Sequence, residues 1–320
     1  MRIAVTGSIA TDHLMTFDGR FVDQLLPDQL DRISLVFLAD DLQVRRGGTG
    51  ANIAFGMAAL GARPLLVGSV GKDAADYLTW LRDHGVDVSG VRTSETLSSP
   101  RFTCTTDADQ NQIGTFYPGA MAEAAAIELA PLGDVDLVVV APNDPGAMLR
   151  HTQECRDRGV TFAADPSQTL SFLDGAAIRA LLEGAEWLFT NEYEAGLIHD
   201  KTGWSPDQVL GVVGTRVTTH GARGAVVSRA GEPDLVVEVV PAREVADPTG
   251  VGDAFRAGFL TAHGWGLGLE RAAQVGALLA TYVVETVGTQ EYVFSAEGFL
   301  GRLAGAYGAA ASDEVAPFLS

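Results

Sequence analysis

The segment spanning residues 247–255 carries the side chains best suited to chemistry. It reads Asp-Pro-Thr-Gly-Val-Gly-Asp-Ala-Phe, so a glycine-flanked run comes directly before a carboxylate and an apolar helical pattern follows. This predicts a loop that opens into a helix, whose first N–H groups lack partners and attract an anion. We expect Gly250, Val251 and Gly252 to bind a phosphoryl group through their backbone N–H groups. Asp253 would then accept the proton of an alcohol, although an ordinary helix start is the alternative reading.

A second glycine-rich segment lies far upstream, at residues 47–52. It reads Gly-Gly-Thr-Gly-Ala-Asn, and it follows a first strand that ends in Gly-Ser-Ile-Ala-Thr-Asp at residues 7–12. With both motifs present in this order, the chain resembles the ribokinase-like (PfkB) carbohydrate kinases from end to end. Within that family it is most similar to the actinobacterial (mycobacterial-type) adenosine kinases, in residues 7–14, 101–107 and 116–121.

The resemblance implies an ATP-dependent kinase that phosphorylates the 5′-hydroxyl of adenosine to AMP, a reaction of purine salvage, with Asp253 as base. Adenosine and ATP would be its partners, Mg²⁺ its cofactor, and K⁺ a further ion. Thr49 stands where ribokinases have a lysine, which disfavours free ribose. The alternatives are another PfkB sugar or nucleoside kinase and a non-catalytic nucleoside-binding sensor, but an intact Asp253 argues against the sensor. No GxGxxG segment follows the first strand to support a Rossmann oxidoreductase.

On the acceptor side, the resemblance implies a pocket for a ribose and its base. Asp12 would hold the 2′- and 3′-hydroxyls, although an Asp in a turn after a strand also forms Asx-turns and caps. Aromatic side chains on the proposed lid strands would stack the base, although aromatic residues in strands also simply pack. The other substrate-binding candidates are Ser8, Phe37, Gly48, Asn52, Phe102, Phe116 and Gln168.

On the nucleotide side, residues 191–194 resemble the Asn-x-x-Glu element of the family. Asn191 and Glu194 would organise Mg²⁺ through water, and an ordinary helix start is the alternative. The resemblance further implies an ATP-binding turn at Thr219, Gly221 and Gly224, and a K⁺ site at Asp247, Thr249 and Gly288.

Short apolar strands alternate with longer helical patterns along most of the chain, which predicts an α/β fold. We expect a ribokinase-like three-layer α/β/α sandwich with a mostly parallel central sheet and a small β-sheet lid. Ligands bind at the carboxyl ends of the strands in such sheets. The expected strands are 3–6, 63–67, 137–140, 161–164, 187–190, 216–219 and 225–228, and the expected helices are 53–60, 77–84, 147–158, 176–184, 193–199, 254–263, 270–285 and 299–307.

Two segments interrupt this alternation, and we assign residues 13–45 and 97–117 to the lid. Residues 1–12, 46–96 and 118–320 would form the large domain, with a frayed or loosely helical tail beyond residue 308. Residues 97–117 read as a hairpin, and the apolar run at residues 33–38 reads as a strand too thin to bury itself. Unpaired strand edges invite association, so we expect a homodimer joined through the lids, in which Phe37 reaches the partner's adenosine site.

The composition excludes several classes of protein. Apolar residues make up 47% of the 320-residue chain, and the net charge of −19 argues against nucleic acid or an anionic membrane as a partner. Two cysteines exclude a disulfide framework. No apolar run is long enough for a transmembrane helix. The N-terminal residues form a short strand that runs into a glycine turn, which is too brief for a signal peptide, so we expect a soluble, cytoplasmic protein.

Overall fold

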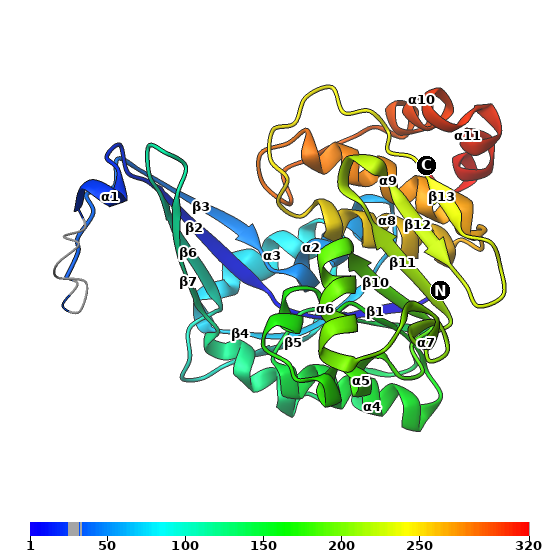
Figure 1. Cartoon of the computed structure of the whole chain (residues 1–320), viewed down its shortest axis with the longest axis horizontal. Coiled ribbons are helices and arrows are strands. Elements are labelled where there is room, and N and C mark those ends of the chain that lie inside the picture. The colour runs from blue at the N-terminus through cyan, green and yellow to red at the C-terminus, as the bar shows by residue number, and fades with distance from the viewer. Residues whose placement is uncertain (25–31, 33, 320) are drawn as a thin grey trace.

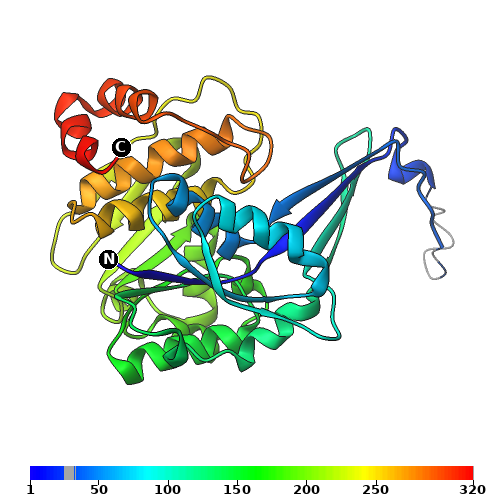
Figure 2. The same ribbon diagram turned by 180° about the vertical axis from the view of Figure 1, so that it is seen from behind.

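The computed structural model describes residues 1–24, 32 and 34–319. Among these residues, nine strands form one sheet in the order β13-β12-β11-β10-β9-β8-β1-β4-β5, and four form a second sheet in the order β3-β2-β6-β7. The second sheet projects from the body in both views, with α1 (Phe21–Gln24) at its far end (Figures 1 and 2). The predicted combination of a large α/β body and a β-lid is therefore confirmed.

The large sheet is parallel from β5 through β11, and only its far strands run antiparallel to their neighbours. Side chains alternate between its two faces. In β1, Ile3 and Val5 pack in one core, whereas Ala4 packs in the other. The strands are β1 (Ile3–Thr6), β4 (Leu65–Val70), β5 (Asp87–Thr93), β8 (Leu137–Val140), β9 (Thr161–Ala164), β10 (Trp187–Asn191), β11 (Thr215–Thr219), β12 (Ala225–Ser228) and β13 (Leu235–Val237).

Helices cover both faces of this sheet, and each face has its own apolar core. One core includes α2 (Thr49–Ala59), α3 (Ala75–Asp83), α8 (Val251–Gly264), α9 (Leu269–Val284), α10 (Ala296–Tyr307) and α11 (Ala309–Val315). The other includes α4 (Pro145–Arg158), α5 (Gly175–Leu182), α6 (Glu192–Thr202) and α7 (Pro206–Leu210). None of the helices in the described residues is long and apolar enough to cross a bilayer.

The structure corrects four expectations at the margins of this body. Strands β5 and β13 were not expected, and the first lid strand, β2 (Ala10–Thr16), begins three residues earlier than residue 13. The tail beyond residue 308 forms α11, which is fixed by the buried side chains of Ala311 and Val315. Residues 34–39 form no strand, and Ile33 lies outside the described residues.

The lid sheet consists of β2, β3 (Asp41–Gly47), β6 (Arg101–Thr106) and β7 (Gln112–Tyr117). The expected hairpin of β6 and β7 is present. Its turn is held by the buried carboxylate of Asp107, which accepts hydrogen bonds from the N–H groups of Asp109 and Asn111. Asp107 also accepts one from the N–H group of Phe21 at 2.9 Å, so the same side chain fixes the far end of the lid.

The two faces of the lid differ in character. Directly paired residues share a face, and one row of pairs consists of Arg45, Asp12, Phe102 and Phe116. The next rows, on the opposite face, include Leu42 and Val44, each 56% exposed, and Ile113, which is 48% exposed. The lid thus has a front face with Asp12 and two phenylalanines, and a back face on which exposed apolar residues lie among polar ones.

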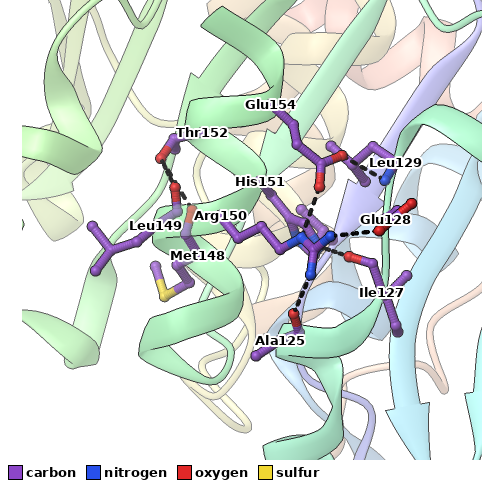
Figure 3. A network of polar contacts seen from close by, with 11 residues as sticks. Ala125, Ile127, Glu128, Leu129, Met148, Leu149, Arg150, His151, Thr152 and Glu154 are labelled. Atoms are coloured by element: carbon purple, nitrogen blue, oxygen red, sulfur yellow. Dashed lines mark hydrogen bonds and ion pairs between the residues drawn. The ribbon is translucent and has the colours of Figure 1, made fainter. Parts of the chain in front are cut away.

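A network of polar contacts, with the buried His151 at its centre, ties the segment after the lid to the body (Figure 3). In α4, His151 is fully buried; its Nε2–H donates to the carbonyl of Ile127 (3.1 Å), so its Nδ1 accepts from the hydroxyl of Thr6 (2.7 Å). Arg150 donates to Glu154 (2.8 Å) and to the carbonyl of Ala125 (3.0 Å). Because both ring nitrogens of His151 are engaged in this way, the ring is held neutral.

We predict that His151 makes the stability of the fold sensitive to acid. Burial lowers the pKa of His151 from 6.5, so the unfolded chain takes up a proton first as the pH falls. The contribution of neutral His151 to the free energy of unfolding is therefore fully present above about pH 6.5 and is lost as the pH falls below it. His151→Leu should cost about 1–3 kcal/mol at neutral pH, because Thr6 and Ile127 lose a partner.

Thermal unfolding of wild type and variant between about pH 7.5 and 5.5 checks this, because the gap between them should narrow as the pH falls. Thr6→Val is the matched control: it removes one hydrogen bond but keeps the imidazole, so the acid-dependent loss should remain. A gap that stays constant with pH for His151→Leu would contradict the prediction.

Candidate active site

The candidate site lies at the carboxyl edge of the large sheet, where it meets the base of the lid. Parallel strands β1, β8, β9, β10 and β11 all end at this edge. The N-terminus of α2 is anchored there by Ser8, whose side-chain oxygen accepts the N–H of Thr49 at 3.0 Å. Gly48, which precedes α2, has a φ of 93°, and a Cβ there would lie 2.6 Å from the Ser8 carbonyl oxygen.

A helix follows the glycine motif, as predicted, but α8 begins at Val251, three residues before the expected start at residue 254, and points its N-terminus into this space. Gly250 precedes it with a φ of 76°, in the left-handed region that glycine adopts without strain. A Cβ at Gly250 would lie 2.8 Å from Thr289 Cγ2, so no larger residue fits. The free N–H groups of the first turn and the carboxylate of Asp253 are thereby presented together.

Asn52 holds the carboxylate of Asp253 in place. Its Nδ2 donates to Asp253 Oδ2 at 2.8 Å, and its Oδ1 accepts from Thr289 (2.9 Å) and Gln290 (3.0 Å). Gln290 also donates to the hydroxyl of the buried Tyr77 (2.6 Å). Asn52 was expected to contact the sugar, but these bonds direct its amide toward Asp253.

Burial raises the pKa of Asp253 to about 6. The charge of Arg256 and the Asn52 hydrogen bond act in the opposite direction, and Glu194 adds to the increase. A carboxylate with this pKa is mostly ionised at neutral pH and is a stronger base than an ordinary aspartate. Asp253 therefore has both the position and the basicity of a general base.

Asp12 lies on strand β2 and not in a turn after β1, which corrects the sequence-based expectation. The lid strand begins at Ala10 because residues 10–16 pair with β3 along their whole length. Burial raises the pKa of Asp12 to about 6, with the charge of Arg45 opposing the increase and those of Asp247 and Asp253 adding to it. The charges of two carboxylates from the far end of the chain, Asp247 and Asp253, thus act on Asp12 at the base of the lid.

An ion pair connects the lid with the loop before α8. Arg45 Nη1 lies 3.3 Å from Asp247 Oδ2, and both side chains are largely buried. Asp247 also accepts the N–H groups of Gly288 (3.1 Å) and Thr249 (2.9 Å). The three residues expected to form a cation site therefore do lie together.

The residues expected on the nucleotide side also come together. Asn191 and Thr219 are directly paired at the ends of β10 and β11. Asn191 and Glu194 form a capping box at the start of α6, with both hydrogen bonds at 2.8 Å. Gly221 and Gly224 both have left-handed backbones in the turn that follows β11. The alternative reading of residues 191–194 as a helix start is thus correct as local structure, and the Mg²⁺ role stays a prediction.

The remaining acceptor-side candidates occupy different positions. Phe102 and Phe116 lie on the front face of the lid in the same row as Asp12. Gln168 is exposed and accepts from the Ser167 hydroxyl at 2.8 Å. Phe37 packs against Phe17 and Phe21, and Phe17 directly follows the last residue of β2.

Two further charged residues lie at the site, and neither of them had a chemical role predicted from the sequence. Asp165 follows β9 and is fully buried, and burial raises its pKa to about 7 despite the opposing charge of Arg256. Arg256 Nη2 lies 2.7 Å from Asp165 Oδ1 and 4.0 Å from Glu194 Oε2. The sequence contained one indication that Arg256 belongs to the site. It follows Asp253 by three residues on a helix, so the two side chains share a face.

Comparison with known proteins identifies the family. Residues 11–295 match the pfkB family of carbohydrate kinases. The chain belongs to this family. A nucleoside kinase of Methanocaldococcus jannaschii is 30% identical over 246 residues, which cover 76% of this chain and 80% of that protein.

Solved structures of this family share the fold. The Burkholderia thailandensis nucleoside kinase in complex with inosine has a TM-score of 0.85 and 34% identity, covering 96% of this chain and 98% of the other. The same enzyme in complex with ADP-inosine has a TM-score of 0.83 and 36% identity, with 96% of each chain covered. The finer resemblance to actinobacterial adenosine kinases stays a prediction.

We predict that Asn52 sets the acid limb of the pH–rate profile. With Asp253 as the predicted base, kcat/KM should fall as the pH drops through about 6, because the carboxylate then becomes protonated. Asn52→Leu removes a donor that favours the charged form, so the limb should move to higher pH. Thr289→Val is the matched control, because it leaves that donor in place. Profiles that coincide for wild type and Asn52→Leu would contradict this role.

Proposed function

We propose that this protein is an ATP-dependent nucleoside kinase that transfers the γ-phosphoryl group of ATP to the 5′-hydroxyl of adenosine, yielding AMP and ADP. The convergence of Asp253, the α8 N-terminus and the front face of the lid carries the proposal. Asp253 supplies a base, the helix N-terminus supplies an anion site, and Asp12 supplies an acceptor for a diol. These are the groups needed for phosphoryl transfer to a sugar hydroxyl.

The reaction follows from these positions. The 5′-hydroxyl gives its proton to Asp253 as its oxygen forms a bond with the γ-phosphorus atom. The bond between that phosphorus and the bridging oxygen breaks, and the electron pair leaves with ADP. The N–H groups of Gly250, Val251 and Gly252 would stabilise the charge on the phosphoryl oxygens.

The proposed reaction would use Mg²⁺, with K⁺ as a further ion. Mg²⁺ commonly binds through one or two carboxylates, phosphates and water. Glu194 would hold it through water, where it would neutralise phosphate charge. Asp247, Thr249 and Gly288 would contribute oxygen atoms to K⁺.

A nucleoside is favoured over a free sugar by the character of the lid. Phe102 and Phe116 lie in the same row as Asp12, so a ribose held by Asp12 would bring its base toward them. Thr49 is 91% buried and its N–H is bound by Ser8, and no lysine reaches the sugar from this position. The relatives named above are nucleoside kinases, and one was solved with inosine. Adenosine is our choice among the purine nucleosides.

A coupled assay with ATP and a panel of acceptors tests the proposal. We expect turnover with adenosine to exceed that with inosine, guanosine, ribose and fructose. Asp253→Asn should lower kcat at least about 10²-fold with little change in ATP binding. A preference for ribose or fructose would assign the protein to a sugar-kinase branch, and ATP-independent nucleoside binding without turnover would indicate a sensor.

The same assay tests the role of Asp12 through 2′-deoxyadenosine. Wild type should prefer adenosine, because the deoxynucleoside leaves one carboxylate contact unmade. Asp12→Ala should lose that preference and raise the adenosine KM while the ATP KM stays near wild type. Unchanged discrimination in the variant would show that Asp12 does not hold the 2′-hydroxyl.

We also propose that the protein is a homodimer joined through the lids. The exposed apolar residues on the back face of the lid and the exposed side chains of Val36 (93%) and Leu38 (83%) support association. Light scattering should give the mass of two 33.6 kDa chains. Phe37→Asp should shift the protein toward monomer and raise the adenosine KM.

Val236→Asp is the control for the dimer, because Val236 is 62% exposed but lies on β13, away from the lid. That variant should remain dimeric. A wild-type mass of one chain would rule out the lid dimer.

A further inference from the structure

The wall beside the anion site carries a charged side chain that the glycine motif does not include. Arg256 lies one turn after Asp253 in α8, and its residue is only 7% exposed. The side chain turns back toward the helix N-terminus. A Cβ built on Gly252 would lie 2.6 Å from Arg256 Nη1, so the guanidinium occupies the space over Gly252.

The partners of Arg256 leave part of it unpaired. Nη2 forms an ion pair with Asp165 at 2.7 Å, and Glu194 lies 4.0 Å away. Nε is buried without a hydrogen-bond partner among the described residues. Buried arginines that serve only structure usually have their donors satisfied, since each unpaired donor is costly. This arginine is instead held at one end, with the other end beside the anion site.

The charge balance points the same way. Asp165, Asp253 and Glu194 surround a single guanidinium, and their charges all act on Arg256. A cation in this position keeps a buried carboxylate cluster from repelling an incoming phosphate. A guanidinium also presents several donors in one plane, which matches the oxygen atoms of a phosphoryl group.

We infer that Arg256 is a catalytic residue that donates hydrogen bonds to the phosphoryl group in transit, while Asp165 positions its guanidinium. The inference rests on the proposed function. A phosphoryl group on the N–H groups of Gly250–Gly252 lies beside Nη1, because Gly252 borders both. Arg256 thus stabilises charge that develops on the equatorial oxygens while Asp253 takes the proton.

Arg256→Lys and Arg256→Ala test this, with Arg271→Lys as matched control. Arg271 is a largely buried arginine on α9 that is paired with Glu314 on α11, so its replacement causes the same kind of packing change. We expect kcat to fall at least about 10²-fold in Arg256→Ala. The adenosine KM should stay within about threefold of wild type, and millimolar guanidinium should restore part of the activity of Arg256→Ala.

Binding of ADP, adenosine and aluminium fluoride provides a readout that a purely structural role would not move. Aluminium fluoride imitates the planar phosphoryl group. Arg256→Lys and Arg256→Ala should therefore weaken the binding of aluminium fluoride by about the same factor as kcat falls, whereas ADP alone should bind as in wild type. If Arg256→Ala fails to fold, Arg256→Lys carries the comparison.

Two outcomes would overturn the inference. One is a kcat within about threefold of wild type in folded Arg256 variants. The other is loss of ADP, adenosine and aluminium fluoride binding together, in step with a lower Tm, which would give Arg256 a structural role only. Wild-type protein that transfers phosphate to no acceptor would instead show that the proposed function is wrong.

Discussion

The burial of several charged side chains at one site is the constraint on which the rest of this structure depends. Asp165, Asp253 and Glu194 meet at the carboxyl edge of the sheet, and desolvation raises the pKa of both aspartates. A buried cluster of carboxylates destabilises the fold unless hydrogen-bond donors and a positive charge are fixed beside it. The N-terminus of α8, the guanidinium of Arg256 on the same helix and the amide of Asn52 on α2 supply those donors.

The packing of the helices explains how those donors are fixed. Helices α8 and α9 cross at small residues, and a Cβ on Gly258 would lie 2.7 Å from the Cα of Gly276. Helix α2 packs on α8 in the same way, with Gly56 against Ala257. Because these helices approach so closely, their N-terminal ends are set by backbone contact and not by long side chains. The position of Asp253 is then determined mainly by the core.

Local patterns predicted much of this fold and less of the site. Short apolar runs identified most strands, and the glycine motif located the start of α8, because both depend on neighbouring residues. β13 escaped prediction because it has only three residues, and the run at 33–38 misled because apolar character alone does not provide a pairing partner. The partners of Asn52 lie more than 200 positions away. No pattern in a single sequence reveals a contact of that kind.

The register of the lid limits how this chain can vary. Asp12 shares a face with Phe102 and Phe116 because β2, β6 and β7 pair without a bulge. One residue inserted in β2 before Asp12 would turn that carboxylate to the back face and place an adjacent residue of the strand on the front face. Insertions in the turn at residues 108–110 leave the pairs untouched. In related sequences, insertions and deletions should therefore occur at the hairpin turn and be absent from the three paired strands.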